Sequence, residues 1–138
     1  MQRLFPTAVL AAFSLAASAS AAPHNSPEGR WLSGSGNVVV QIAPCGPVLC
    51  GTIVKVLANN AMDGGAPMAP RPGAGMGLKI MTDFKPDGAG QWVGRLYNRQ
   101  TGKTYDCQLS DIGPARMTVR PYVLLPLIGK TQVWRRAP

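Results

Sequence analysis

The sequence contains few of the side chains that most enzymes use for catalysis. Its 138 residues include one histidine and six acidic residues, against fourteen lysines and arginines. The histidine, His24, lies upstream of every predicted strand, and the chain has no Gly-x-Ser-x-Gly motif. We therefore expect no catalytic mechanism that depends on a Ser–His or Cys–His pair.

A pair of carboxylates is the remaining enzymatic alternative, because two such groups roughly 5 to 9 Å apart can hydrolyse a glycosidic bond. Asp87 and Asp111 lie in turn-like sequences. Asp106 lies within a predicted strand whose apolar face is Tyr105, Cys107 and Leu109, so we expect it to point to solvent. We predict that the protein is not an enzyme, with a carboxylate-based hydrolase as the alternative. The acidic residues to consider are Glu28, Asp63, Asp83, Asp87, Asp106 and Asp111.

Cysteine is also scarce, with only Cys45, Cys50 and Cys107. Cys45 and Cys50 flank a turn, which favours a short-range disulfide between them in an oxidising compartment. The alternatives are a bridge from Cys107 to either partner, or an unpaired Cys107 buried as a small apolar residue. A zinc site would need a fourth ligand that the chain lacks, so we predict no metal and no cofactor.

Long apolar runs are absent except at the N-terminus. There, Arg3 precedes an apolar stretch from Leu4 to Ala17, and small residues follow up to Ala22. This is the plan of a secretory signal peptide, and the stretch is shorter than the ~20 residues of a membrane-spanning helix. We predict a signal peptide over residues 1–21, cleaved after Ala21. The product would be a periplasmic or secreted single domain over residues 22–138, without a transmembrane segment.

The mature chain keeps thirteen Lys and Arg against six Asp and Glu, a net charge of +7. These cations are scattered along the sequence, and only Arg135 and Arg136 are adjacent. A nucleic-acid-binding surface would need a denser basic stripe with aromatic side chains, so we predict no nucleic-acid partner. Attraction to an anionic envelope surface remains a weaker alternative.

What the chain does contain is a repeated alternation of apolar and polar residues in short runs, which is typical of half-buried strands. Turn sequences rich in Gly, Pro, Asn and Asp separate the runs, so sequential strands should be antiparallel neighbours. The predicted strands are Gly29–Leu32, Asn37–Ala43, Leu49–Leu57, Leu78–Phe84, Gln91–Tyr97, Lys103–Ser110, Arg116–Val123 and Lys130–Arg136.

Eight sequential strands without a covering helix must protect two sheet edges and one apolar face, and closure into a barrel does both. We predict an all-β fold, a small eight-stranded up-and-down antiparallel barrel, with a β-sandwich as the alternative. The long Gly/Pro/Ala connection at 58–77 would lie at the barrel mouth. Pro121, inside the seventh strand, predicts a bulge or a break there.

The two ends of the predicted domain are similar to those of lipocalins. Gly29-Arg30-Trp31 opens the first strand, and Gln132-Val133-Trp134-Arg135 lies in the last. Lipocalins share a Gly-x-Trp in the first strand and an arginine in the last strand that packs over the tryptophan. The resemblance implies a lipocalin-like barrel in which Trp31 and Arg135 close one end.

Six segments, in order, resemble a family of secreted bacterial proteins catalogued as domain of unknown function 2147. The family has no established activity, so the resemblance implies a lipocalin-like barrel and export, and no catalytic residues. The segments are Gly29-Arg-Trp, Ile42-Ala-Pro-Cys-Gly, Leu49-Cys-Gly-Thr-Ile-Val, Gly94-Arg-Leu-Tyr, Thr101-Gly-Lys-Thr-Tyr and Pro126-Leu-Ile-Gly-Lys-Thr-Gln-Val-Trp-Arg.

Two functional hypotheses follow. An eight-stranded barrel is either filled by side chains or just wide enough for one small ligand. In the first hypothesis the barrel binds a small hydrophobic or amphipathic ligand, with Trp92, Tyr105 and Tyr122 as candidate lining residues. In the alternative, a filled barrel acts through its surface on an envelope component or another exported protein.

Overall fold

The structure is a computed structural model that describes residues 3–4, 8–12, 14, 25–59, 75–123 and 129–138. Most of the predicted signal peptide at 1–21 lies outside the described residues, as does the centre of the connection at 58–77. Within the described ranges, no helix is long and apolar enough to cross a membrane.

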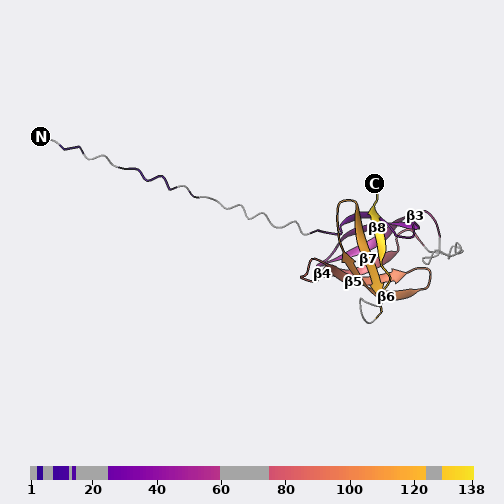
Figure 1. Ribbon diagram of the computed structural model, residues 1–138. Helices are drawn as coiled ribbons and strands as arrows, with labels where there is room; N and C mark the ends of the chain where they lie inside the picture. Colours follow the sequence, from indigo (N-terminus) through magenta and orange to yellow (C-terminus); the bar gives the residue numbers. More distant parts are fainter. Residues whose placement is uncertain (1–2, 5–7, 13, 15–24, 60–74, 124–128) are drawn as a thin grey trace.

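Eight strands form one closed barrel in sequence order, and the last strand pairs with the first (Figure 1). Every neighbouring pair is antiparallel, which confirms the predicted up-and-down barrel over the β-sandwich. The strands are β1 (Gly29–Leu32), β2 (Val38–Cys45), β3 (Val48–Val56), β4 (Lys79–Pro86), β5 (Trp92–Asn98), β6 (Lys103–Ser110), β7 (Arg116–Tyr122) and β8 (Gln132–Arg136).

The up-and-down order gives the barrel two distinct ends. One end carries the short turns at 46–47, 87–91 and 111–115, the segment before β1 and the residues after β8. We call it the closed end. The opposite end carries the connections at 33–37, 57–78, 99–102 and 123–131, and we call it the open end.

Apolar side chains from all eight strands fill much of the barrel interior. Their alternation with exposed neighbours follows from the two-residue period of a strand, which sends every second side chain inward. The buried members include Trp31, Val40, Ile42, Ile53, Met81, Phe84, Leu96, Cys107, Leu109, Met117, Val119 and Trp134.

Trp31 seals the closed end of the barrel. Its indole is fully buried, and Nε1 donates a 2.8 Å hydrogen bond to the carbonyl oxygen of the buried Pro27. The guanidinium of Arg136 lies over the indole, 3.9 Å from the ring centroid. Arg136 also donates hydrogen bonds to three backbone carbonyl oxygens, those of Glu28, Gly113 and Pro114. One arginine thus connects the N-terminal segment, the β6–β7 turn and β8.

The arginine over Trp31 is Arg136 and not Arg135, which corrects the expectation from the lipocalin resemblance. In the β1–β8 pairing, Trp31 lies opposite Arg136, and Leu32 lies opposite Arg135. Because successive side chains on a strand point to opposite faces, only one of two adjacent arginines can cover the indole. Arg135 is exposed on the outer face.

Gly29 is needed where it stands in the Gly-x-Trp motif. Its φ of 121° lies in a region that side chains rarely adopt. A Cβ atom there would also lie 2.6 Å from Nη1 of Arg136. The glycine therefore leaves the space through which Arg136 reaches the closed end.

A β-bulge in β4 explains why a glycine is needed at position 94 on the facing strand. The β4–β5 register shifts between Thr82 and Lys85, where Asp83 has a φ of 58°. On the facing strand, a Cβ atom at Gly94 would lie 2.6 Å from the ring of Phe84. Gly94 therefore admits the Phe84 side chain to the core, as glycines opposite bulges often do.

Pro121 does not cause the predicted bulge. The β6–β7 register runs without a shift through the Cys107–Pro121 pair. The β7–β8 register ends with Val119 opposite Gln132, before Pro121 is reached. The strand pairing of β7 is therefore interrupted at Pro121 only on the side that faces β8.

The cysteines divide into one disulfide and one free thiol. Cys45 and Cys50 are bonded across the β2–β3 turn with Cα atoms 5.8 Å apart, which confirms that pairing over a bridge to Cys107. Cys107 is fully buried in the core. Burial disfavours the thiolate and raises the pKa of Cys107 from 9.0 to about 12.

Replacing Arg136 with alanine should lower the free energy of unfolding by about 2 to 4 kcal/mol, because it removes the stacking on Trp31 and three hydrogen bonds to carbonyl groups. Arg135→Ala is the matched control and should cost under about 0.5 kcal/mol, since Arg135 is exposed. Urea unfolding followed by tryptophan fluorescence would compare the two. Equal losses would contradict the assignment of Arg136 as the sealing residue.

The Cys107 thiol should make stability depend on pH above 9. Its pKa is raised in the folded state, so its contribution is complete below about pH 9 and is lost as the pH rises toward 12. Between pH 9 and 10.5 the free energy of unfolding of the wild type should fall by up to about 1.4 kcal/mol per pH unit more than that of Cys107→Ala. Urea unfolding at several pH values measures how the free energy of unfolding of each protein changes with pH. Identical slopes for the wild type and the variant would show that the Cys107 thiol does not cause this pH dependence.

Candidate functional site

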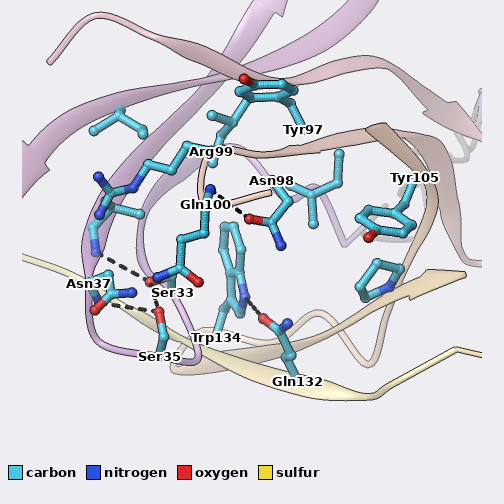
Figure 2. A pocket seen from close by; sticks show the side chains of 15 residues that line it. Ser33, Ser35, Asn37, Tyr97, Asn98, Arg99, Gln100, Tyr105, Gln132 and Trp134 are labelled. Carbon is cyan, nitrogen blue, oxygen red and sulfur yellow. Dashed lines mark hydrogen bonds between the residues drawn. The ribbon is translucent and has the colours of Figure 1, made fainter. Parts of the chain in front are cut away.

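A cavity of about 80 Å³ lies at the open end of the barrel (Figure 2). Its floor is apolar and comes from barrel strands, with Val38, Ile53, Ile80, Leu96 and Trp134. Its remaining walls are rich in hydroxyl and amide groups, from Ser33, Ser35, Asn37, Asn98, Gln100 and Gln132. The cavity therefore combines an apolar base with polar groups that come mainly from two connections of the open end.

Three polar side chains are buried in the described part of the chain, and all three line this cavity. Ser33 is 9 % exposed, Asn37 4 % and Gln100 8 %. Burial of a polar group is costly unless hydrogen bonds compensate it, so buried polar side chains are uncommon in a small core. The described polar interior of this barrel is thus confined to its open end.

Local hydrogen bonds hold the side chains of Ser33, Ser35 and Asn98 in the cavity wall. The two hydroxyl oxygens of Ser33 and Ser35 are 3.2 Å apart, and Val38 N–H donates to Ser33 Oγ at 3.3 Å. In the other connection, Gln100 N–H donates to Asn98 Oδ1 at 2.8 Å. These bonds fix the two turns, and the cavity walls are therefore largely pre-formed.

Trp134 is the central aromatic residue of the cavity. Figure 2 shows its indole among the polar side chains, with Nε1 donating a 3.1 Å hydrogen bond to Gln132 Oε1. The indole is 2 % exposed, so its fluorescence should respond to a change inside the cavity. Arg99 is the one charged residue of the lining, and its Nη2 donates to Ala58 O and Asn59 Oδ1, each at 3.2 Å.

The structure separates the three aromatic residues that the sequence suggested as ligand contacts. Tyr105 lines the cavity. Trp92 does not: it begins β5 at the closed end, and its Nε1 donates to the carbonyl oxygen of Asn25 at 3.2 Å. Tyr122 is also outside the lining and pairs in register with Asp106. Desolvation, followed by the charge of Asp106, raises the pKa of Tyr122.

The sequence analysis missed the polar lining and Trp134. It interpreted residues 33–36 and 99–102 as turns and placed Asn37 at the start of a strand. The available signal was topological, because in an up-and-down barrel the first and fifth connections lie at the same end. Polar side chains next to strand ends in both connections therefore converge.

A second hollow of about 420 Å³ lies outside the barrel, between the turn at 33–36 and β8. Arg135, expected at the closed end, contributes to this hollow. Its lining is Gly34, Ser35, Thr131, Gln132, Val133 and Arg135.

The described carboxylates lie away from the cavity, on exposed turns or outer strand faces: Glu28, Asp83, Asp87, Asp106 and Asp111. The sixth, Asp63, lies outside the described residues. Among the residues that the structure describes, no group of three or more His, Cys, Asp or Glu side chains is placed to hold a metal ion.

No curated protein and no solved structure matches the chain. A family model matches residues 29–136, which span the barrel from its first strand to its last. The chain therefore belongs to the family described as an uncharacterized protein conserved in bacteria, domain of unknown function 2147.

Proposed function

We propose that this protein is an exported binding protein that holds the short apolar part of a small amphipathic molecule at the open end of its barrel. The convergence of the buried polar side chains of Ser33, Asn37 and Gln100 around an apolar floor carries this proposal. Ligand sites in proteins combine mostly apolar walls with a few placed polar groups. The polar head of the ligand would face the amides and hydroxyls, and its apolar part would contact Leu96 and Trp134.

The cavity volume limits the size of the ligand. About 80 Å³ is smaller than the ~150 Å³ cavity that accommodates benzene, so only a short alkyl or methylated group would be enclosed. A long acyl chain would extend beyond the cavity. The ligand class is therefore a small amphipathic molecule, or a larger one that inserts only its end.

Two sequence features support export. The N-terminal residues follow the plan of a signal peptide. The Cys45–Cys50 disulfide suits an oxidising compartment outside the cytoplasm. A periplasmic or secreted location would expose the open end to envelope molecules.

We propose binding without catalysis. The described carboxylates are exposed and do not line the cavity, which disfavours the hydrolase alternative. The cavity offers amides, hydroxyls and aromatic rings, which suit recognition more than proton transfer.

The filled barrel that acts through its surface is the second candidate function. The small cavity favours it, because sites for drug-sized ligands enclose about 300 to 1,000 Å³. In this case the polar residues of the open end would only stabilise the connections. Ligand titration distinguishes the two candidates.

Short amphiphiles should change the tryptophan fluorescence of the purified protein in a saturable way. We expect the affinity of a series of straight-chain carboxylates and alcohols to rise about fourfold per methylene while the chain fills the cavity, and then to become constant. Val38→Phe places a larger side chain in the cavity and should abolish the response. Fluorescence titration, with native mass spectrometry for stoichiometry, measures both effects.

Val133→Phe is the matched control, since Val133 is 46 % exposed on β8 and does not line the cavity. It should bind with the wild-type affinity. Absence of a saturable response for the whole series would reject the binding function and favour the filled barrel. An undiminished response in a folded Val38→Phe variant would place binding elsewhere.

A further inference from the structure

The open end also carries most of the exposed apolar side chains of the barrel domain. Of the five large apolar residues that are clearly exposed among the described residues from 25 onward, four lie there. Leu57 is 50 % exposed, Met76 72 % and Val123 55 %. Val56, at the end of β3, is the fourth, and a Cβ atom at Gly75 would lie 2.8 Å from its Cγ2 atom. The connection before β4 therefore lies against the end of β3, so that Val56, Leu57 and Met76 belong to one region.

Lysine residues have the same asymmetric distribution. The chain has five lysines, and four of them lie toward the open end: two begin β4 and β6, one is next to last in β3, and one lies in the connection before β8. All four are exposed. Only Lys85 lies toward the closed end. The four open-end lysines are Lys55, Lys79, Lys103 and Lys130.

The described acidic residues are distributed in the opposite way, and Asp63, which belongs to the connection at 57–78, lies outside the described residues. Glu28, Asp87 and Asp111 lie in the segment and turns of the closed end. Asp83 and Asp106 lie within strands, and Asp106 is paired in register with Arg95. Among the described residues, the open end therefore has four exposed lysines, on three strands and one connection, without a matching set of carboxylates.

We propose that the open end of the barrel docks onto an anionic membrane surface. Exposed apolar side chains can enter the lipid interface while lysines around them contact acidic headgroups, and binding strength depends on both contributions. A lysine near such a surface contributes about 1 kcal/mol, and the effect is screened by salt. We favour lipid over an acidic protein because the apolar residues and lysines belong to several separate strand ends and connections around one end.

This inference does not require the proposed ligand site, although the geometry links the two. The cavity opens at the same end, so docking would present it to molecules at the lipid surface. A membrane amphiphile could then insert its end between the polar walls without crossing bulk water.

Vesicle co-sedimentation with the full mature protein tests the docking face. At low salt the protein should bind vesicles that contain phosphatidylglycerol, and should not bind vesicles of phosphatidylcholine alone. Lys55→Glu with Lys103→Glu should weaken binding at least about tenfold. The matched control is Lys85→Glu with Arg116→Glu, two exposed closed-end positions with the same change in net charge, and it should change binding less than about threefold.

The apolar contribution is tested by Leu57→Gln against Val93→Gln, a partly exposed apolar position near the closed end of β5. Only Leu57→Gln should reduce vesicle binding, by several-fold. Circular dichroism would show that each variant is folded. Equal losses in the open-end and closed-end charge variants, or no binding to phosphatidylglycerol vesicles, would overturn the proposal. Val38→Phe should still bind vesicles, so a failure of docking and a failure of ligand binding can be distinguished.

Discussion

The contact between Arg136 and Trp31 is the interaction on which the organisation of this barrel depends. A closed sheet removes its edges but leaves two openings, and each must be filled or used. Here Trp31, its hydrogen bond to Pro27 and the covering guanidinium fill one of them. Gly29 has a positive φ and no Cβ so that the arginine can pass. The buried polar side chains among the described residues lie at the other end.

The filled interior defines how the remaining opening can be used. Large apolar side chains such as Met81, Phe84 and Met117 are fully buried in the core and fill much of the described barrel interior beyond the cavity. What remains is a small cavity bounded by Trp134 and by the polar connections. The Ser33 hydroxyl and the Asn98 side chain accept hydrogen bonds from backbone N–H groups of the two connections, which offsets part of the cost of placing polar groups there. Such a site can recognise a head group and a short apolar segment, but it has little room for more.

The fold was largely predictable from the sequence, whereas the candidate site was not. The alternation of apolar and polar residues, together with the turn residues, predicts eight strands and their order. The proximity of two cysteines across a turn predicts the Cys45–Cys50 disulfide. Choosing between Arg135 and Arg136 requires the β1–β8 register, which a short motif does not determine. Likewise, aromatic character alone does not reveal that Trp92 lies at the closed end while Tyr105 lines the cavity. Both failures concern the relative placement of residues that are distant in sequence.

The two ends of the barrel use their cations differently, and this difference connects stability with function. At the closed end the Arg136 side chain is held by an indole and by backbone carbonyls, so its charge serves the fold. At the open end Lys55, Lys79, Lys103 and Lys130 are exposed, and a flexible ammonium group on a long side chain adds little to stability. Solubility alone would be served by lysines at either end. Their concentration beside exposed apolar residues is better explained by a surface that meets an anionic, partly apolar partner.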